Sequence, residues 1–328
     1  MRDIAARTPV AVFGIVLGIA GLGGAWRAAH TVWGLPTAIG EAIMAIASVV
    51  WLALMILYGT KWWFTRETAA AECRHPIQSC FVAFVPMATM LIAVSARPYA
   101  EEAAFCLFLL GAGSSLMFAI YHAGQLSTGG RDPAAVTPAL VLPVVGFCYV
   151  SAIGAGAFGN LGLGQILFGA GLLAWLPIEA AVRFRLYTAA EMPPPLRPTL
   201  GILLAPPAVG AVAFLSTSVG PPDRIGAFLI GYALLQVLLL IRLLPWIAKQ
   251  PFAASWWAFG FGIDALAIAP LLFIQQGGTG PLVSLAPVLF VFANLAIGAL
   301  AVGTLVLMAQ GRFLPERPMT LITYPPGL

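Results

Sequence analysis

Long apolar stretches separated by short polar segments recur along the whole chain. Ten stretches stand out, at about residues 9–29, 38–60, 76–96, 102–124, 137–158, 161–182, 198–219, 225–247, 252–275 and 281–309. Each is close to the ~20 residues that a helix needs to cross the hydrocarbon core of a bilayer. Their apolar character is nearly continuous, whereas a membrane-spanning β-strand alternates apolar and polar positions. The pattern therefore predicts ten transmembrane helices.

The composition agrees with this pattern. Of the 328 residues, 61% are hydrophobic and only 9% are charged, whereas soluble domains carry about 25% charged residues. No polar segment approaches the roughly 50 residues of a separate soluble domain. We therefore expect an all-α polytopic membrane protein with a single transmembrane domain over residues 1–328, embedded in the lipid bilayer.

The basic residues predict an orientation. With ten spans, all but three of the 16 Lys and Arg residues fall on the side that holds both termini; the exceptions are Arg27, Arg97 and Arg224. Cytoplasmic loops are enriched in Lys and Arg, so we expect both termini to be cytoplasmic and the protein to lie in the cell (inner) membrane. The basic loops also account for the pI near 9, and no nucleic-acid partner is implied. The first stretch is longer than a signal-peptide core, and we interpret it as the first helix.

Helix-perturbing residues recur near the middle of alternate stretches, from the first to the ninth. They are Gly14, Pro86, Pro143, Pro206 and Gly262. A proline leaves the carbonyl four residues earlier without its helical hydrogen bond, and a membrane tolerates such a carbonyl only within protein or beside water. The alternation predicts five helical hairpins, with the odd-numbered helices in an inner ring around a central pore that these breaks line. The alternative is that Gly and Pro are simply common in membrane helices.

Polar side chains within the stretches give little sign of catalysis. Cys73, His75 and Cys80 lie close together, but a fourth zinc ligand is not evident. No metalloprotease or serine-hydrolase motif is present, so we expect neither an enzyme nor a cofactor. Glu179 is expected to pair with Arg183 one helical turn away. Gln236 and Asn294 are expected to bond neighbouring helices rather than a substrate.

Several stretches resemble one known family, and they occur in that family's order. They read Phe13-Gly14-Ile15, Gly201-Ile202-Leu203-Leu204-Ala205-Pro206, Arg242-Leu243-Leu244-Pro245-Trp246, Trp256-Trp257-Ala258-Phe259-Gly260-Phe261-Gly262 and Phe290-Val291-Phe292-Ala293-Asn294. This set, which extends from about residue 8 to about 312, resembles the tellurite-resistance/dicarboxylate transporter family. That family holds the bacterial TehA proteins and the slow-type anion channels of plant guard cells.

The resemblance implies a fold, an assembly and a gate. Family members have ten helices in five hairpins around a pore, form trimers with one pore in each protomer, and close the pore with a phenylalanine on the ninth helix. By position in the matching run, that residue is Phe261. Phe259 lies two residues away, about 200° around a helix, so the two cannot face the same path.

The charge along the inner helices favours an anion channel, with one exception. The apolar cores of the odd-numbered stretches lack Lys and Arg, which suits conduction because a permeant ion must bind weakly enough to leave. Asp264 lies three residues after Phe261 and is a candidate proton or charge site, since intramembrane acids are functional suspects. It is expected to be protonated, paired with Arg242, or turned away from the path. The alternative function is therefore a proton-coupled transporter of small oxyanions or C4-dicarboxylates (the tellurite, sulfite and malate class).

Overall fold

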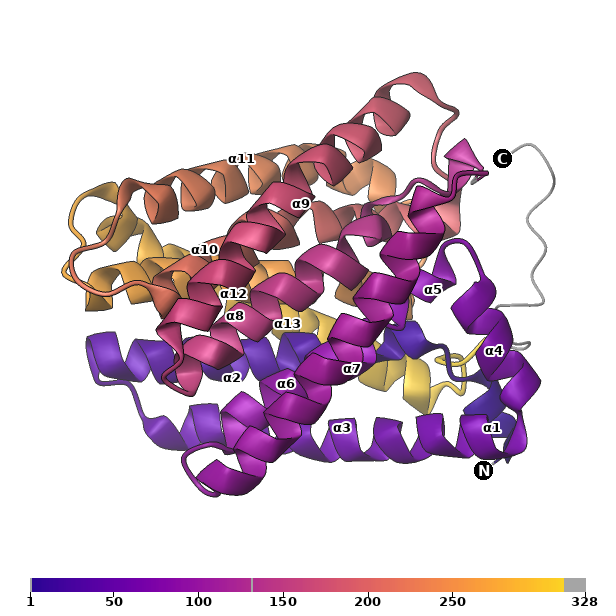
Figure 1. Ribbon diagram of the computed structural model, residues 1–328, viewed down its shortest axis with the longest axis horizontal. Helices are drawn as coiled ribbons and strands as arrows, with labels where there is room; N and C mark the ends of the chain where they lie inside the picture. The colour runs from indigo at the N-terminus through magenta and orange to yellow at the C-terminus, as the bar shows by residue number, and fades with distance from the viewer. Residues whose placement is uncertain (1, 131, 316–328) are drawn as a thin grey trace.

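The structure, a computed structural model, describes residues 2–130 and 132–315. Within these ranges the chain is helical without strands, and ten helical spans are long and apolar enough to cross a membrane. The prediction of an all-α polytopic membrane protein is confirmed. Figure 1 shows the spans lying alongside one another as one bundle. Two of the basic residues counted for the orientation, Arg131 and Arg317, lie outside the described residues.

The even-numbered spans are uninterrupted α-helices. They are α3 (Thr37–Phe64), α7 (Glu101–Ser127), α9 (Leu161–Thr188), α11 (Arg224–Ile247) and α13 (Pro281–Ala309). Where prolines occur inside them, at Pro177, Pro245 and Pro287, the helix continues through the proline. These spans are exposed along most of their length, as a face in contact with lipid requires.

The odd-numbered spans have a different construction, because each starts as a separate helix, which is 3₁₀ or π in four spans and a single α-helical turn in the third, and continues as a longer α-helix. The pairs are η1 (Val10–Phe13) with α2 (Gly14–Trp33), α5 (Gln78–Phe81) with α6 (Phe84–Ala96), η3 (Pro138–Leu140) and the π-helix η4 (Leu142–Gly146) with α8 (Phe147–Ala157), η5 (Pro194–Leu204) with α10 (Ala205–Thr217), and η6 (Ala254–Phe259) with α12 (Gly260–Gln275). Mid-helix 3₁₀ and π segments often mark functional positions.

Burial separates the two sets of spans. In the odd-numbered spans between 72 and 83% of the apolar core is buried, against 17 to 33% in the even-numbered spans. Small residues allow the buried helices to approach closely. A Cβ atom on Gly260 of α12 would lie 3.3 Å from the Cα atom of Gly18 on α2. Such contacts are typical of helix packing in membranes, where small residues let backbones meet.

The proline argument predicted backbone carbonyls without hydrogen bonds at the helix breaks, and two of these carbonyls do have hydrogen bonds. Val82 accepts a hydrogen bond from the Val85 amide at 3.2 Å, and Ile202 accepts one from the Ala205 amide. The expectation of unpaired carbonyls is wrong at these two positions. The reason is that the chain tightens to i→i+3 bonding just before each proline, which satisfies the carbonyl within the span.

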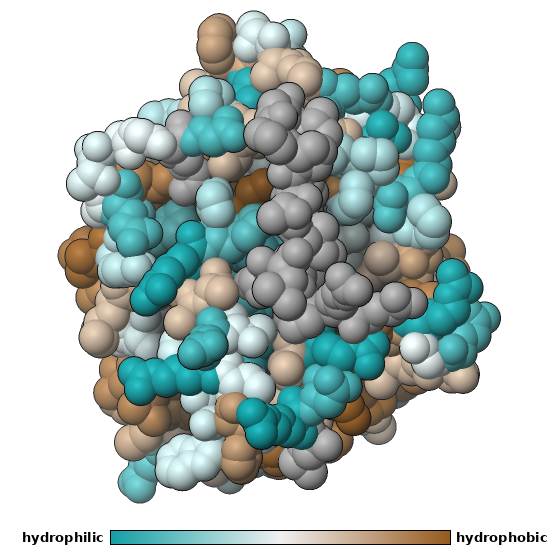
Figure 2. Space-filling model, turned by 90° about the vertical axis from the view of Figure 1, so that its right-hand side faces the viewer, coloured by the Kyte–Doolittle hydropathy of each residue, from teal (hydrophilic) through white to brown (hydrophobic). Residues whose placement is uncertain are grey.

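Short helices cover the end of the molecule at which the described chain begins and ends. These are α1 (Arg2–Arg7), α4 (Arg66–Arg74) and η2 (Pro133–Ala135). Arg7 donates from Nε to the carbonyl of Pro315 at 2.8 Å, which joins the two ends. We call this the terminal end of the molecule. Figure 2 shows hydrophilic side chains spread over much of it.

A buried ion pair holds this end together. Lys61 near the end of α3 and Glu72 on α4 are 2% and 3% exposed, and Nζ lies 2.6 Å from Oε2. Lys61 also donates to the Thr8 carbonyl, and the Val10 amide donates to Glu72. The pair therefore fixes the chain just where the first span starts.

Candidate functional site

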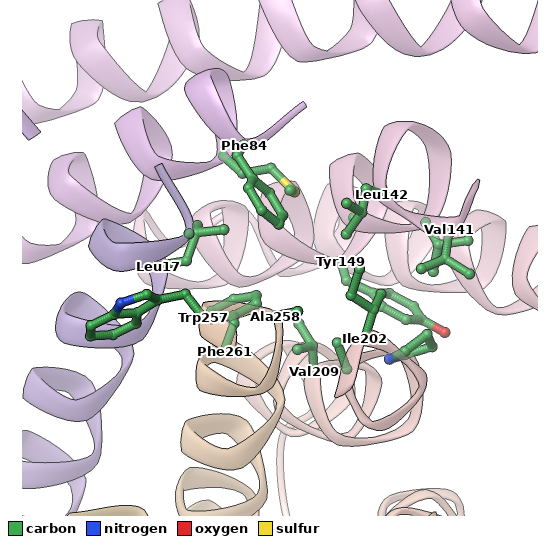
Figure 3. Close-up of a pocket in the computed structure, with 16 residues that line it drawn as sticks. Leu17, Phe84, Val141, Leu142, Tyr149, Ile202, Val209, Trp257, Ala258 and Phe261 are labelled. Carbon is green, nitrogen blue, oxygen red and sulfur yellow. The ribbon is translucent and has the colours of Figure 1, made fainter. Parts of the chain in front are cut away.

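A small cavity lies at the centre of the odd-numbered spans. Its volume is about 40 Å³, which is room for about three water molecules. Its walls come from all five odd-numbered spans, as Figure 3 shows, and include Leu17, Phe84, Leu142, Ile202, Val209, Trp257 and Phe261. Nearly all of these side chains are apolar. A permeant anion would find almost no polar group to replace its water there.

A larger cavity, which we call the vestibule, lies on the other side of Phe261. It has a volume of about 420 Å³ and is lined by the C-terminal halves of the odd-numbered spans, away from the terminal end. Its wall includes Gly21, Thr31, Ser95, Ser216, Ile268 and Gln275. Two residues, Phe261 and Val209, line both the central cavity and the vestibule. They therefore lie where the two spaces adjoin.

The residues next to Phe261 pack closely against neighbouring spans. Phe261 occupies the first turn of α12. A Cβ atom on Gly262 would lie 3.1 Å from the backbone nitrogen of Ala205, and Gly260 faces Gly18 in the same way. Both glycines thus permit close packing of α12 against its neighbours. Trp257 anchors the preceding turn, because its Nε1 donates to Thr304 of α13 at 2.8 Å.

Phe259 occupies a different place. It lines an apolar groove between α11, α13 and η6, and its ring stacks on Trp256 with centroids 6.0 Å apart. A Cβ atom on Gly201 would lie 2.6 Å from this ring, so Phe259 fills the space beside η5. The expectation that the two phenylalanines face different directions agrees with this geometry.

The five predicted helix breaks fall at or near the places where the odd-numbered spans change conformation. Gly14 and Pro206 line the central cavity. Pro86, Pro143 and Gly262 do not line it, although neighbours of each do, among them Met87, Leu142 and Phe261. The expectation that all five line the pore stays a prediction, since this cavity is one part of the proposed path. A break redirects the chain, and the side chain beside it then reaches the cavity.

Asp264 lies outside the walls of both cavities. It is fully buried and packs against α2, where a Cβ atom on Gly21 would lie 2.7 Å from its Oδ2. It lines neither the central cavity nor the vestibule. Neither carboxylate oxygen has a hydrogen-bond partner in the described part of the chain, so pairing with Arg242 is not observed. An ionised carboxylate in such a site would carry a large desolvation cost.

Other polar expectations are confirmed. Arg183 donates from Nε to Glu179 at 2.8 Å and from Nη2 to Gln236 of α11 at 2.6 Å. Asn294 of α13 accepts from Trp26 of α2 at 2.9 Å. The bonds of Gln236 and Asn294 join neighbouring helices in the way that polar residues do within membranes, whereas the Arg183–Glu179 pair lies within α9.

The cysteine and histidine residues around α4 do not gather into a metal site. Within residues 2–130 and 132–315, no three His, Cys, Asp or Glu side chains are close enough to hold one ion. Burial raises the pKa of the Cys73 thiol, and the neighbouring Glu72 carboxylate adds to the effect.

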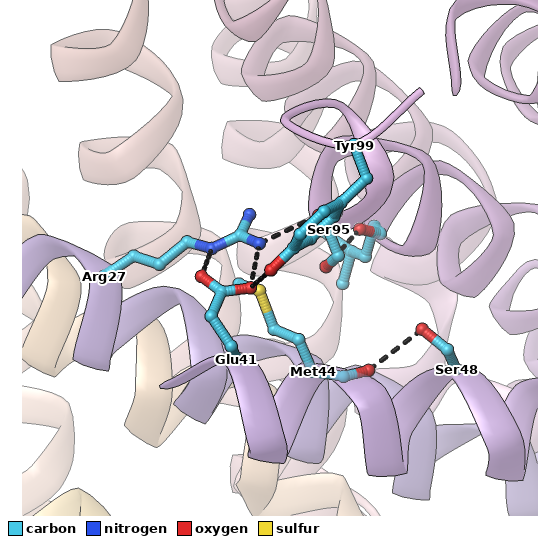
Figure 4. Close-up of polar contacts among 7 residues, drawn as sticks. Arg27, Glu41, Met44, Ser48, Ser95 and Tyr99 are labelled. Atoms are coloured by element: carbon cyan, nitrogen blue, oxygen red, sulfur yellow. Dashed lines mark hydrogen bonds and ion pairs between the residues drawn. The ribbon is translucent and has the colours of Figure 1, made fainter. Parts of the chain in front are cut away.

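Two residues that line the cavities were not predicted from the sequence. Phe84 covers Gly14 in the central cavity, with 3.3 Å between its ring and a Cβ atom placed on that glycine. Arg27 lines the vestibule, and it pairs with Glu41 of α3 (Figure 4). From the sequence, Arg27 served only to predict orientation. Its distance of about 3.6 turns from Gly14 places it about 220° around the helix, so helical spacing gave no signal that Arg27 lies on a cavity wall.

Comparisons with known proteins agree with this geometry. The SLAC1 family, described as voltage-dependent anion channel, matches residues 7–305. The tellurite resistance protein TehA homolog of Haemophilus influenzae is 31% identical over 306 residues, which cover 93% of this chain and 92% of that protein. The S-type anion channel SLAH2 of Arabidopsis thaliana is 26% identical over 286 residues, or 82% of this chain and 53% of the plant protein. The chain thus spans about half the length of its plant relative.

Proposed function

Since this chain belongs to the SLAC1 family of voltage-dependent anion channels, which confirms the resemblance found in its sequence, we propose that it conducts small anions through a central pore that Phe261 closes. One observation carries the proposal: Phe261 lines both the central cavity and the vestibule. Truncation of its ring would join the two spaces. Hydrophobic constrictions of this kind close pores by excluding water.

The pore is formed by the odd-numbered spans as an inner ring, with the even-numbered spans around them as the second helices of five hairpins. The contrast in burial between the two sets supports this arrangement. The interruption of the α-helix in all five odd-numbered spans supports it as well, since interrupted helices at membrane depth belong inside the protein.

The apolar wall of the central cavity favours conduction of anions over tight binding. An anion that is held by a fixed cation at mid-membrane leaves slowly, whereas a pore without such a cation releases it. The cavity wall has no Lys or Arg among its described residues. The same apolar wall disfavours water in the closed state, so the phenyl ring of Phe261 alone is sufficient to block anions.

The protein is a multi-pass membrane protein of the inner membrane, with both termini cytoplasmic, and it assembles as a homotrimer. The orientation rests on the excess of Lys and Arg on the terminal side, since cytoplasmic loops are enriched in these residues. The trimer rests on the resemblance alone. Exposed, apolar even-numbered spans offer surface both to lipid and to neighbouring copies.

A proton-coupled transporter of oxyanions or C4-dicarboxylates is the second candidate. The observation that favours it is Asp264, a fully buried acid without a described partner on the helix of Phe261. Its position beside Gly21 rather than in the path makes it the weaker candidate.

Anion flux into liposomes tests the proposal. Purified wild type, Phe261→Ala and the matched control Phe259→Ala are reconstituted, and the entry rate of chloride or nitrate is followed by a fluorescent anion indicator. We expect fast flux only in Phe261→Ala, because Phe259 lies in the peripheral groove. Equal flux in the two variants would show that the gate lies elsewhere. Flux in neither, with proton-dependent uptake of an organic acid by wild type, would favour the transporter.

A further inference from the structure

The vestibule carries one charged side chain among the described residues of its wall, the guanidinium of Arg27. This residue lies on α2, beyond Gly21 and Gly24, on the side of Phe261 away from the terminal end. Any anion that passes between the vestibule and Phe261 passes this wall. The sequence placed Arg27 near a membrane surface, and the structure adds that it faces the path.

Three of the five N–H donors of Arg27 are already used. Nε donates to Glu41 Oε1 at 2.7 Å, and Nη2 donates to Glu41 Oε2 at 2.7 Å and to the Ser95 carbonyl at 2.9 Å. Tyr99 holds Glu41 from the other side with a 2.6 Å hydrogen bond. A guanidinium has five donors, so within the part of the chain that the structure describes the two N–H groups on Nη1 remain. Figure 4 shows that Nη1 has no hydrogen bond to the residues drawn.

The hydrogen bonds that hold Arg27 to Glu41 and Ser95 have two consequences for an anion. They fix the guanidinium plane, so little side-chain entropy is lost when Nη1 donates. The negative charge of Glu41 also offsets part of the positive charge of Arg27, so the electrostatic field in the vestibule is weaker. Weak, directed binding is what conduction requires, because the ion must also leave.

We propose that the Nη1 edge of Arg27, positioned by Glu41 and Ser95, is a binding site for partly hydrated monovalent anions in the vestibule and sets the anion preference of the pore. The site extends the proposed function and rests on it, because an anion bound here lies beside the gate at Phe261 on the proposed pathway. Nη1 donates to the anion while Nε and Nη2 keep their bonds to the carboxylate.

Currents in a Phe261→Ala background test the site, since that variant opens the pore independently of Arg27. At about 0.01 M salt, where charges act over roughly 30 Å, Arg27→Gln is expected to lower the chloride current about ten-fold, the lower range of electrostatic focusing. Arg27→Lys restores part of the current, and Glu41→Gln raises it several-fold. Arg97→Gln is the matched control, because Arg97 pairs with Glu101 outside the vestibule, and it leaves the current within about two-fold.

The double variant Arg27→Gln/Glu41→Gln separates the donor from the net charge. Its vestibule has the same net charge as the parent but lacks Nη1, so we expect a current at least about three-fold below the parent. A current equal to the parent's would overturn the proposal, because charge balance alone would then explain the single variants. Unchanged current in Arg27→Gln would overturn it as well.

Anion binding at equilibrium tests the site without any current. Nitrate should raise the thermal unfolding midpoint of the wild-type protein in detergent, because a ligand stabilises the state that binds it, and the increase should be lost in Arg27→Gln. Equal stabilisation of both proteins would contradict the site. If Phe261→Ala carries no current while this difference persists, the proposed gate fails and the anion site stands.

Discussion

The buried ion pair between Lys61 and Glu72 allows a sharp test of the structure. Both side chains are at most 3% exposed, and Nζ lies 2.6 Å from Oε2. In Lys61→Met the carboxylate stays buried and, among the described residues, keeps only the long bond from the Val10 amide, at 3.3 Å. Removal of one partner from such a pair costs about 3–5 kcal/mol, because a charge is left uncompensated.

Removal of both charges should cost much less. In Lys61→Met/Glu72→Leu no buried charge remains, and replacement of a buried pair by apolar side chains is often close to neutral. We therefore expect a coupling energy of at least about 2 kcal/mol between the two positions. At about 2 °C per kcal/mol for a chain of this size, Lys61→Met should lower the unfolding midpoint by about 6–10 °C, and the double variant should recover most of that loss.

The assay is thermal unfolding in detergent, followed by intrinsic tryptophan fluorescence. Lys249→Met is the matched control, because Lys249 is exposed and forms no ion pair among the described residues. A loss of less than about 2 °C in Lys61→Met, or a double variant as unstable as the sum of the single variants, would refute the buried pair.

Two further predictions concern Asp264 and Cys73. Asp264→Asn in the Phe261→Ala background should change the chloride current less than about two-fold, since the side chain packs against Gly21 and lines neither cavity; a loss of proton-dependent uptake in this variant would instead identify a coupled transporter. Burial raises the pKa of the Cys73 thiol, and the thiolate is the form that reacts, so alkylation of Cys73 by iodoacetamide at pH 8 should be slower than that of an ordinary exposed cysteine and should accelerate as the pH rises above 9. An alkylation rate that stays constant from pH 8 to 10, measured by mass spectrometry of the Cys73 peptide, would contradict that environment.

The spans could be predicted from the sequence because lipid imposes a length and an apolar composition on every helix. The stretch at 225–247 became α11, Arg224–Ile247, and the stretch at 281–309 became α13, Pro281–Ala309. The even-numbered helices extend past the apolar stretches where polar residues continue the helix, as α9 does to Thr188. A hydropathy pattern cannot place such ends.

The irregular halves of the odd-numbered spans were only partly predictable. Gly14 and Pro206 indicated where regular helix would be interrupted, but the 3₁₀ bonding that satisfies the Ile202 carbonyl was not anticipated. Proline removes a donor without dictating how the chain before it adapts. The choice between an open carbonyl and a tightened turn depends on packing against neighbouring spans.

The wall of the path was the least predictable part. Lys61 served as a cytoplasmic-loop residue in the orientation count, yet it is buried in an ion pair. Arg27 served as an exception in the same count, yet it lines the vestibule. Both placements depend on partners on other helices, Glu72 and Glu41, and a single sequence does not show which distant residues meet.

The current carried by Phe261→Ala tests the gated anion pore most directly. Wild type and Phe261→Ala are expressed in oocytes, and chloride is exchanged for nitrate on one side while the cation is held constant. We predict a small current in wild type and a large current in Phe261→Ala whose reversal potential follows the anion gradient, since Phe261 lines both the central cavity and the vestibule. A Phe261→Ala current no larger than that of wild type, or one whose reversal potential follows the cation, would contradict the gated anion pore.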